Sequence, residues 1–228
     1  MKEGPIQFQP FNELGEVRIY KHGILPHWRQ SGCTYFVTFR LAESLPGSVL
    51  RELEDNRHEW LRRHGIEPDL PDWKNQFAKL PGDQQREYER EVGTSMNEQL
   101  DRGFGSCELR RPELSLIAEE GLMHFHSDRV WTGDYVVMPN HVNALMTPIV
   151  PFELEDLLKS IKGFTAKEIN RATGTSGTFW QRQSFDHIVR DSEQLRLFQN
   201  YIRDNPTKAR LKEDSFRWVS AEYDCAKL

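Results

Sequence analysis

A histidine and an asparagine two positions apart are the side chains of this chain best spaced to hold a metal ion together. His141 and Asn143 follow the tight Pro139-Asn140 corner in a segment with the composition of a strand. Residues two positions apart in a strand project from the same face, so both side chains could reach one ion. An amide oxygen is a neutral, hard ligand that suits Mg²⁺ or Mn²⁺, whereas a lone histidine is more often a hydrogen-bonded structural residue.

A tyrosine and an asparagine four positions apart form a second pair. Tyr201 and Asn205 lie in a segment with helical periodicity, in which residues at this spacing share a face. Because Leu195 and Phe198 are nearby at the same periodicity, Tyr201 taken by itself reads as a core aromatic. Asn205 precedes Pro206 and is equally well explained as the residue that ends the helix.

Strands and helices alternate along the chain, and they must position these pairs. The sequence predicts strands at 34–40, 131–138 and 142–148, with an extended segment at 179–189. Helical periodicity covers 48–63, 83–101, 112–123 and 152–171, and a last helix begins at Asp191 or Ser192. Residues 64–82 read as an irregular connection. This pattern predicts an α+β fold, with an antiparallel sheet covered by helices on one face.

Charge is divided unevenly along the 228 residues, a length that fits a single domain, 1–228. The net charge is −5. Residues 51–101 hold 8 Lys/Arg and 13 Asp/Glu, a balance of −5, whereas residues 156–213 hold 11 and 7, a balance of +4. The basic C-terminal third is either a solvated surface of mixed charge or an electrostatic footprint for phosphate.

Cysteine usage and hydropathy indicate a cytoplasmic protein. Cys33, Cys107 and Cys225 are widely spaced and odd in number, which fits neither a disulfide framework nor a zinc ribbon. No apolar run approaches the ~20 residues that span a bilayer, and the start of the chain does not have the pattern of a signal peptide. We therefore expect a soluble, cytoplasmic protein with no membrane partner.

Three separated blocks resemble one family. They are Leu25-Pro-His-Trp28 with Thr34–Leu41, then Val137-Met-Pro-Asn-His-Val-Asn143, and finally Trp180-Gln-Arg182 with Phe185–Asp191, Tyr201–Pro206 and Lys208–Leu211. In this order and spacing they resemble the REP-associated tyrosine transposases, a branch of the single-tyrosine HUH transposases. The resemblance covers residues 20–45 and 105–212, so residues 48–104 are expected to form a helical, acidic insertion.

The resemblance implies a fold, a partner and an activity. The fold is a ferredoxin-like antiparallel sheet of four or five strands with helices on one face, often in a homodimer. The activity is the nicking and rejoining of single-stranded or hairpin DNA, with the tyrosine four residues before the Asn-Pro pair, Tyr201, as nucleophile. Its hydroxyl attacks phosphorus and leaves a 5′-phosphotyrosine, while a divalent ion, Mg²⁺ or Mn²⁺, polarises the phosphate.

Asn143 departs from the family pattern, in which histidine, a hydrophobic residue and a second histidine follow one another. Three outcomes are open: a weaker metal site, a preference shifted towards Mg²⁺, or no site. His141 is the remaining histidine ligand that the resemblance implies. Asn205 matches a position from which family members commonly supply a third polar ligand.

Further side chains are candidates for contacts with DNA. They are Lys159, Lys162, Lys167, Arg182, His187 and Arg190. The three lysines lie in one expected helix and are equally well explained as its solvated face. His124-Phe-His126 has the letters of a metal motif, but it lies outside the family's position, at an expected junction between helix and strand.

Two functions follow from these residues. The first is a metal-assisted, tyrosine-dependent endonuclease and strand transferase of the transposase type. The alternative, which Asn143 supports, is a catalytically weakened or inactive protein of the same fold that binds DNA hairpins without cutting them. A third class, an RNA-binding module, is weaker, because residues 35–39 lack the clear alternation that paired exposed aromatics require.

Overall fold

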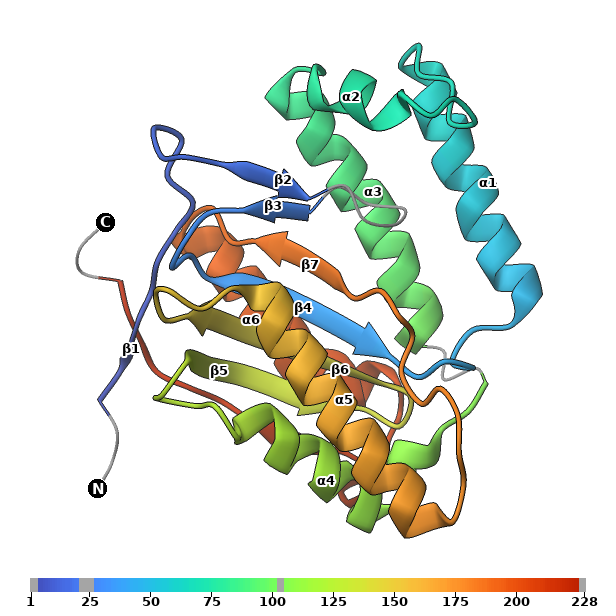
Figure 1. The fold of residues 1–228 in the computed structure, drawn as a ribbon, viewed down its shortest axis with the longest axis vertical. Coiled ribbons are helices and arrows are strands. Elements are labelled where there is room, and N and C mark those ends of the chain that lie inside the picture. Colours follow the sequence, from blue (N-terminus) through green and yellow to red (C-terminus); the bar gives the residue numbers. More distant parts are fainter. Residues whose placement is uncertain (1–3, 21–26, 102–104, 226–228) are drawn as a thin grey trace.

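A five-stranded antiparallel sheet lies at the centre of the computed structural model, which describes residues 4–20, 27–101 and 105–225 (Figure 1). The strand order across the sheet is β7-β4-β6-β5-β8. The bounds are Tyr35–Arg40 for β4, Val130–Val137 for β5, His141–Pro148 for β6, Phe185–Ile188 for β7 and Arg217–Val219 for β8. β-Branched and aromatic residues are frequent in these strands because they pack well on a pleated surface.

Apart from the helices inserted between β4 and α4, four of these strands and two helices occur in the order β4-α4-β5-β6-α5-β7. Helix α4 spans Pro112–Met123 and α5 spans Leu154–Thr173. Together with the sheet order β7-β4-β6-β5, this is the ferredoxin-like arrangement. The predicted α+β class and antiparallel sheet are therefore confirmed. Strand β8 extends the sheet beyond β5 and was not among the strands predicted from the sequence.

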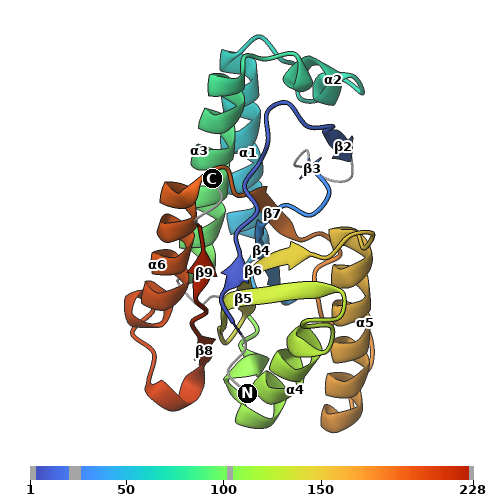
Figure 2. The same ribbon diagram turned by 90° about the vertical axis from the view of Figure 1, so that its left-hand side faces the viewer.

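The two faces of the sheet are covered by different helices. Tyr35, Val37 and Phe39 of β4 pack in the core beneath α4 and α5, whereas Phe36 packs on the opposite face beneath α6 (Ser192–Lys208). Figure 2 shows the sheet with α5 on one side and α6 on the other. Helices therefore cover both faces of the sheet, whereas the sequence predicted helices on one face only.

Helix α6 begins where the sequence predicts but ends later. Asp191 caps the start, where its Oδ1 accepts a hydrogen bond of 2.8 Å from the Gln194 N–H. The end lies at Lys208, past Pro206, so the prediction that Asn205-Pro206 ends the helix is wrong. A proline in the last turn removes one hydrogen bond, and the Ala209 N–H still reaches the Asn205 carbonyl at 3.0 Å.

Three helices between β4 and α4 form an arm beside the sheet (Figure 1). They are α1 (Gly47–Arg63), α2 (Trp73–Ala78) and α3 (Gly82–Asp101). The arm has an apolar core of its own, built from Trp60, Leu61, Ile66, Trp73, Phe77 and Tyr88. The expected insertion at 48–104 covers these helices, with 102–104 outside the described residues, and α2 replaces part of the irregular connection expected at 64–82. In the described parts of the chain, no helix is long and apolar enough to cross a membrane.

Short elements near the chain ends complete the fold. Strand β1 (Ile6–Gln7) pairs in parallel with β9 (Tyr223–Asp224), and β2 (Arg18–Tyr20) pairs with β3 (His27–Arg29). Single helical turns lie at Glu108–Arg110 and Glu213–Ser215. None of these elements was predicted, because strands and helical turns of two or three residues are too short to show a periodicity in the sequence.

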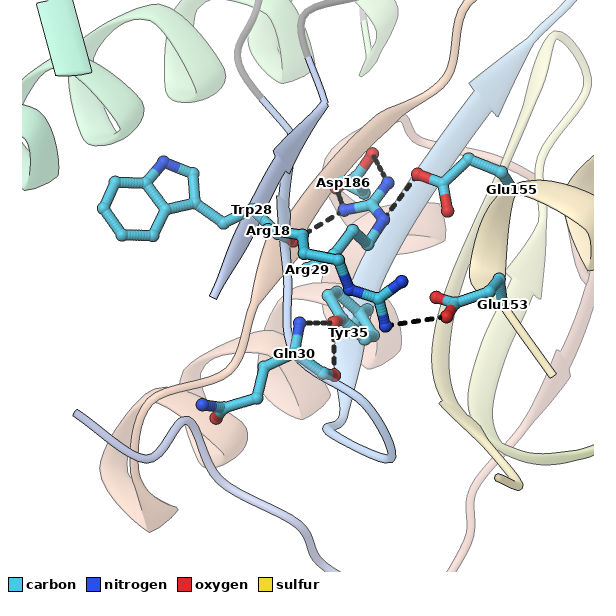
Figure 3. Close-up of polar contacts among 8 residues, drawn as sticks. All are labelled: Arg18, Trp28, Arg29, Gln30, Tyr35, Glu153, Glu155 and Asp186. Carbon is cyan, nitrogen blue, oxygen red and sulfur yellow. Dashed lines mark hydrogen bonds and ion pairs between the residues drawn. The ribbon is translucent and has the colours of Figure 1, made fainter. Parts of the chain in front are cut away.

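A buried ion-pair network fastens β3 to the rest of the molecule (Figure 3). The Arg29 guanidinium bonds both carboxylate oxygens of Asp186 on β7, one of them at 2.9 Å, and also bonds Glu155 at the start of α5. The side chains of Arg29 and Asp186 are only 4% and 2% exposed. Because the pair is nearly dry and bidentate, it fixes the position of β3 against the edge strand of the sheet.

Candidate functional site

His141 and Asn143 point to the face of the sheet that α6 covers. Along β6, Val142, Ala144 and Met146 lie in the core beneath α4 and α5, so the alternate residues face the other way. Leu145 confirms this, because it packs in the core that contains α6. His141 and Asn143 are both fully buried. The predicted common face of this pair is therefore present, and it lies in the interior of the protein.

Helix α6 runs along this face towards His141. It begins four residues after Ile188, which pairs with Tyr35 at one end of β4. The other end of β4 is Arg40, which pairs with His141. Part-way along, the rings of Phe198 and Tyr201 contact Phe36, with centroids 4.4 Å and 5.8 Å away. The helix therefore starts above the Tyr35 end of the sheet and approaches its His141 end.

Asn205 comes one helical turn after Tyr201 on the same face. Tyr201 contacts Phe36, which pairs with Leu145 on β6. Four residues of helix advance by about 6 Å, which is close to two residues of strand. This step takes Asn205 further towards the His141 end of the sheet than Tyr201. Asn205 is fully buried, and neither its Oδ1 nor its Nδ2 has a hydrogen-bond partner within the described ranges.

Asn143 is held by a residue that the sequence reasoning missed. The Thr38 hydroxyl donates a hydrogen bond of 2.7 Å to Asn143 Oδ1, while Asn143 Nδ2 has no hydrogen-bond partner in the described part of the chain. Thr38 pairs with Asn143 across β4 and β6. Since a hydroxyl can also accept, a turn of the amide would let Thr38 accept from Nδ2 and would free the oxygen. The sequence could have identified Thr38 by its position two residues after Phe36, since residues at this spacing lie on the same face of a strand.

His141 is a neutral imidazole in this environment. Its Nδ1 lies 2.7 Å from Asn140 Oδ1, so Nδ1 carries the proton and Nε2 carries the lone pair that a metal ion would use. Complete burial lowers the pKa of His141 to about 3. The ring therefore stays uncharged over the physiological pH range, which a metal ligand requires.

The donor atoms on this face fit a hard divalent ion only weakly. His141 Nε2 and the amide oxygens of Asn143 and Asn205 are all neutral, whereas sites for Mg²⁺ usually include a carboxylate. The buried carboxylate of Asp134 on β5 is engaged, because it accepts from Gln199 on α6 at 3.0 Å and from Ser220 at 3.1 Å. Among the described residues, no three His, Cys, Asp or Glu side chains gather in a metal-binding group. The negative charge for a bound ion would have to come from a ligand outside this donor set.

Tyr201 is partly exposed on α6, one helical turn before Asn205. Its ring lies edge-on to Phe36 on one side, and Lys208 Nζ lies 5.4 Å from the ring centroid. Lys208 belongs to the third block of the family resemblance, but the sequence alone gave it no role. Its spacing of seven residues, two helical turns, was the available signal.

The predicted lysines lie away from Tyr201. Lys159, Lys162 and Lys167 are on α5, which covers the opposite face of the sheet. Lys162 Nζ donates to the Arg182 carbonyl at 2.9 Å and to Ser184 Oγ at 3.2 Å, and burial lowers the pKa of Lys162 to about 8. The structure thus joins Lys162 to the loop of Arg182 and does not bring these four residues to the Tyr201 face.

His187 and Arg190 lie closer to α6. The His187 ring is 5.4 Å from the Phe198 ring, and its Nε2 lies 2.9 Å from Gln194 Nε2. Burial and, to a smaller extent, the charge of Arg190 lower the pKa of His187 to about 4, so the ring is neutral near pH 7. The Arg190 guanidinium lies over the Phe11 ring at 5.9 Å. His187 therefore belongs to the packing under α6 and is not a cation that attracts phosphate.

The His124-Phe-His126 motif has a structural role in the turn before β5. His126 Nδ1 accepts a hydrogen bond of 3.1 Å from the Thr132 N–H. His124 is exposed at the end of α4, where its ring stacks on Phe164 with centroids 6.2 Å apart. The two side chains therefore have separate environments.

Comparison with known proteins finds similarity only at the level of solved structures. No family model matches the chain, and no curated protein matches it. A REP-associated tyrosine transposase bound to a REP hairpin is 15% identical, with a TM-score of 0.44 over 82% of this chain and 73% of that one. A candidate transposase from Deinococcus radiodurans is 14% identical, with a TM-score of 0.26 over 75% of this chain and 89% of that one. Both similarities are too distant to assign a function, so the assignment depends on the motifs and on the site.

Proposed function

We propose that this protein binds single-stranded or hairpin DNA and nicks and rejoins it through Tyr201. The observation that carries the proposal is the amide of Asn205, fully buried and without hydrogen-bond partners in the described chain, one helical turn after Tyr201. Polar groups that are dry and unpartnered destabilise a fold, so their presence next to a tyrosine indicates a site kept for chemistry.

The reaction is a transesterification that conserves the number of phosphoester bonds. Tyr201 Oη loses its proton to water and attacks phosphorus, and the bond from phosphorus to the 3′ oxygen breaks. The products are a 5′-phosphotyrosine and a free 3′-hydroxyl, which can reverse the step and rejoin the strand. The Lys208 ammonium, 5.4 Å from the ring centroid, would attract the phosphate to the nucleophile.

A bound Mg²⁺ or Mn²⁺ would polarise the scissile phosphate and offset its charge. His141, Asn143 and Asn205 are the residues that would hold this ion. Because all three are fully buried, DNA must displace part of the cover formed by α6 and the C-terminal segment before the phosphate can reach them. The weak, neutral donor set implies that ion and DNA bind together.

An adduct assay tests the proposal directly. Hairpin oligonucleotides with single-stranded flanks, labelled at the 3′ end, are incubated with protein in Mg²⁺, Mn²⁺ or EDTA. A labelled covalent adduct should form in either metal, and Tyr201→Phe should abolish it. Tyr135→Phe is the matched control, because Tyr135 lies in the same sheet on the opposite face. Absence of an adduct across a panel of hairpins in both metals would exclude the catalytic proposal.

A second candidate function, hairpin binding without cleavage, is favoured by one observation. The hydrogen bond from Thr38 engages the oxygen of Asn143 that a metal ion would need. Asn143→His separates the two functions, since it supplies an imidazole at the same position of β6. If an adduct forms only in the Asn143→His variant, the natural protein is a binding protein.

A further inference from the structure

The interior of the helical arm contains a second group of buried polar atoms without partners. Arg57 on α1 is 5% exposed, and its Nε and Nη1 have no hydrogen-bond partner in the part of the chain that the structure describes. The same is true of Trp60 Nε1 and of the Tyr88 hydroxyl, both in fully buried side chains. All of these atoms can donate a hydrogen bond. They are remote in sequence from Tyr201, and the proposed nicking reaction does not use them.

Arg57 has too few acceptors for its charge. Its Nη2 bonds Glu54, with His58 beside it, and the guanidinium lies 5.0 Å above the Trp73 ring. Tyr88 lies near the guanidinium, whose charge opposes the rise in the pKa of this phenol that burial causes. Buried N–H groups without acceptors are rare in native proteins, because each costs about 1–3 kcal/mol.

A cavity between α1 and α3 adjoins Arg57 and Trp60. Its volume is about 260 Å³, and its walls include Arg57, Trp60, Leu53, Val92 and Ser95. Arg63 and Glu91 also line it and form an ion pair of 3.6 Å with each other. This volume is smaller than a typical pocket for a drug-sized ligand, so it admits only a small molecule.

We propose that this cavity binds a small anion, a carboxylate or a phosphate, through the Arg57 guanidinium and the Trp60 indole N–H. Donors without acceptors select an anion, and the planar guanidinium is suited to a carboxylate or phosphate. A DNA strand is a poor candidate, because residues 51–101 carry a balance of −5 and repel a polyanion. A single small anion is held by direct bonds at short range and so is less affected by the surrounding acidic surface.

Titration of the ¹⁵N-labelled full chain with sodium acetate, citrate and inorganic phosphate, at constant ionic strength, tests this site. The indole signal assigned to Trp60 by Trp60→Phe should shift and saturate with at least one of the anions, and the anion that succeeds identifies the chemistry. Arg57→Lys, which keeps the charge but loses the planar fork, should weaken this binding at least tenfold. Arg51→Lys is the control, because Arg51 is exposed on the same helix.

The five remaining tryptophan signals report whether the Arg57→Lys chain is folded. If it is not, Trp60→Phe replaces it, since that change removes the indole N–H and keeps an aromatic ring; binding, followed through the Arg57 Nε–H signal, should weaken severalfold. The proposal is overturned if the Trp60 signal fails to saturate with all three anions, or if a folded variant binds as tightly as the natural chain.

Discussion

Strand β6 presents two unlike faces to the helices on either side of the sheet. Towards α4 and α5 it presents Val142, Ala144 and Met146, whereas towards α6 it presents His141 and Asn143. All five side chains are fully buried, so the second face holds polar groups in surroundings as dry as those of the first.

The difference separates the part of the molecule that maintains the fold from the part that we assign to chemistry. An apolar face gains stability in proportion to the area it removes from water, and it needs no partner beyond good packing. A polar face of the same burial loses stability wherever an atom lacks a hydrogen bond. The α6 face keeps such atoms on Asn143 and Asn205. Substitutions on the two faces should therefore have opposite effects.

The largest effect is expected on the apolar face. Leu114 on α4 is fully buried in the core beneath α4 and α5. Leu114→Ala should lower the free energy of unfolding by about 2–5 kcal/mol, because it leaves a cavity. Urea denaturation measures this loss, and adduct formation per folded molecule should not change. A loss below ~1 kcal/mol would show that this face is not the main source of stability.

The polar face should respond to pH. Burial lowers the pKa of His187 to about 4, whereas the unfolded chain binds a proton near pH ~6.5. The stability that depends on neutral His187 is therefore complete above pH 6.5 and is lost as the pH falls to 4. At about 1.4 kcal/mol for each pKa unit, this loss is about 3 kcal/mol.

Urea denaturation at a series of pH values checks this dependence. His187→Gln should flatten the decline in the free energy of unfolding between pH 6.5 and 4, while His124→Gln, at an exposed position, should leave it unchanged. Burial also lowers the pKa of His141, to about 3, so its protonation lowers the free energy of unfolding in the same way as the pH falls. This contribution is present in both variants. An unchanged decline in His187→Gln would contradict the assignment.

Replacement of an unpartnered polar group by an apolar one should stabilise the α6 face. Asn205→Leu removes two buried atoms that lack hydrogen bonds and keeps a similar volume. The free energy of unfolding should rise by about 1–3 kcal/mol, while the adduct disappears. Thermal unfolding and the adduct assay measure the two effects on the same sample. A destabilised variant would mean that Asn205 has a structural role.

The smallest effect is expected at Lys208. Lys208→Met keeps the length of the side chain but removes the charge near the Tyr201 ring, and it should slow adduct formation about tenfold, which corresponds to about 1.4 kcal/mol. Lys212→Met is a matched control on the exposed segment after α6. A further test is salt dependence, since added salt should slow the natural chain more than Lys208→Met if the ammonium attracts the phosphate.

The central fold was predictable because its elements have strong periodicity. The strands at 34–40, 131–138 and 142–148 and the helices at 112–123 and 152–171 coincide with β4, β5, β6, α4 and α5 to within a few residues. The face that each helix covers was not predictable for α6, because its apolar residues fit either side of a sheet. Strand β8 has three residues and becomes a strand only by pairing with β5.

The common face of each residue pair was predictable, whereas the surroundings of the pairs were not. Spacing placed His141 with Asn143 and Tyr201 with Asn205, and the structure puts both pairs on the α6 face. Their complete burial and the Thr38 hydrogen bond depend on side chains from other strands, which a single sequence does not register. The lysines of α5 lie on the opposite face of the sheet from Tyr201, which the sequence could not show, because charge along a sequence does not reveal on which side of a sheet a helix packs.

The position of the arm also affects how the sheet can assemble during folding. Strands β4 and β6 are neighbours in the sheet, yet Arg40 and its partner His141 are separated by the whole of α1 to α4. A flexible loop of this length would slow their pairing, since the entropy of closure increases with the number of free residues. The arm has its own apolar core, so its early collapse would shorten the effective loop. A segment that takes no part in the sheet would thereby help its two central strands to meet.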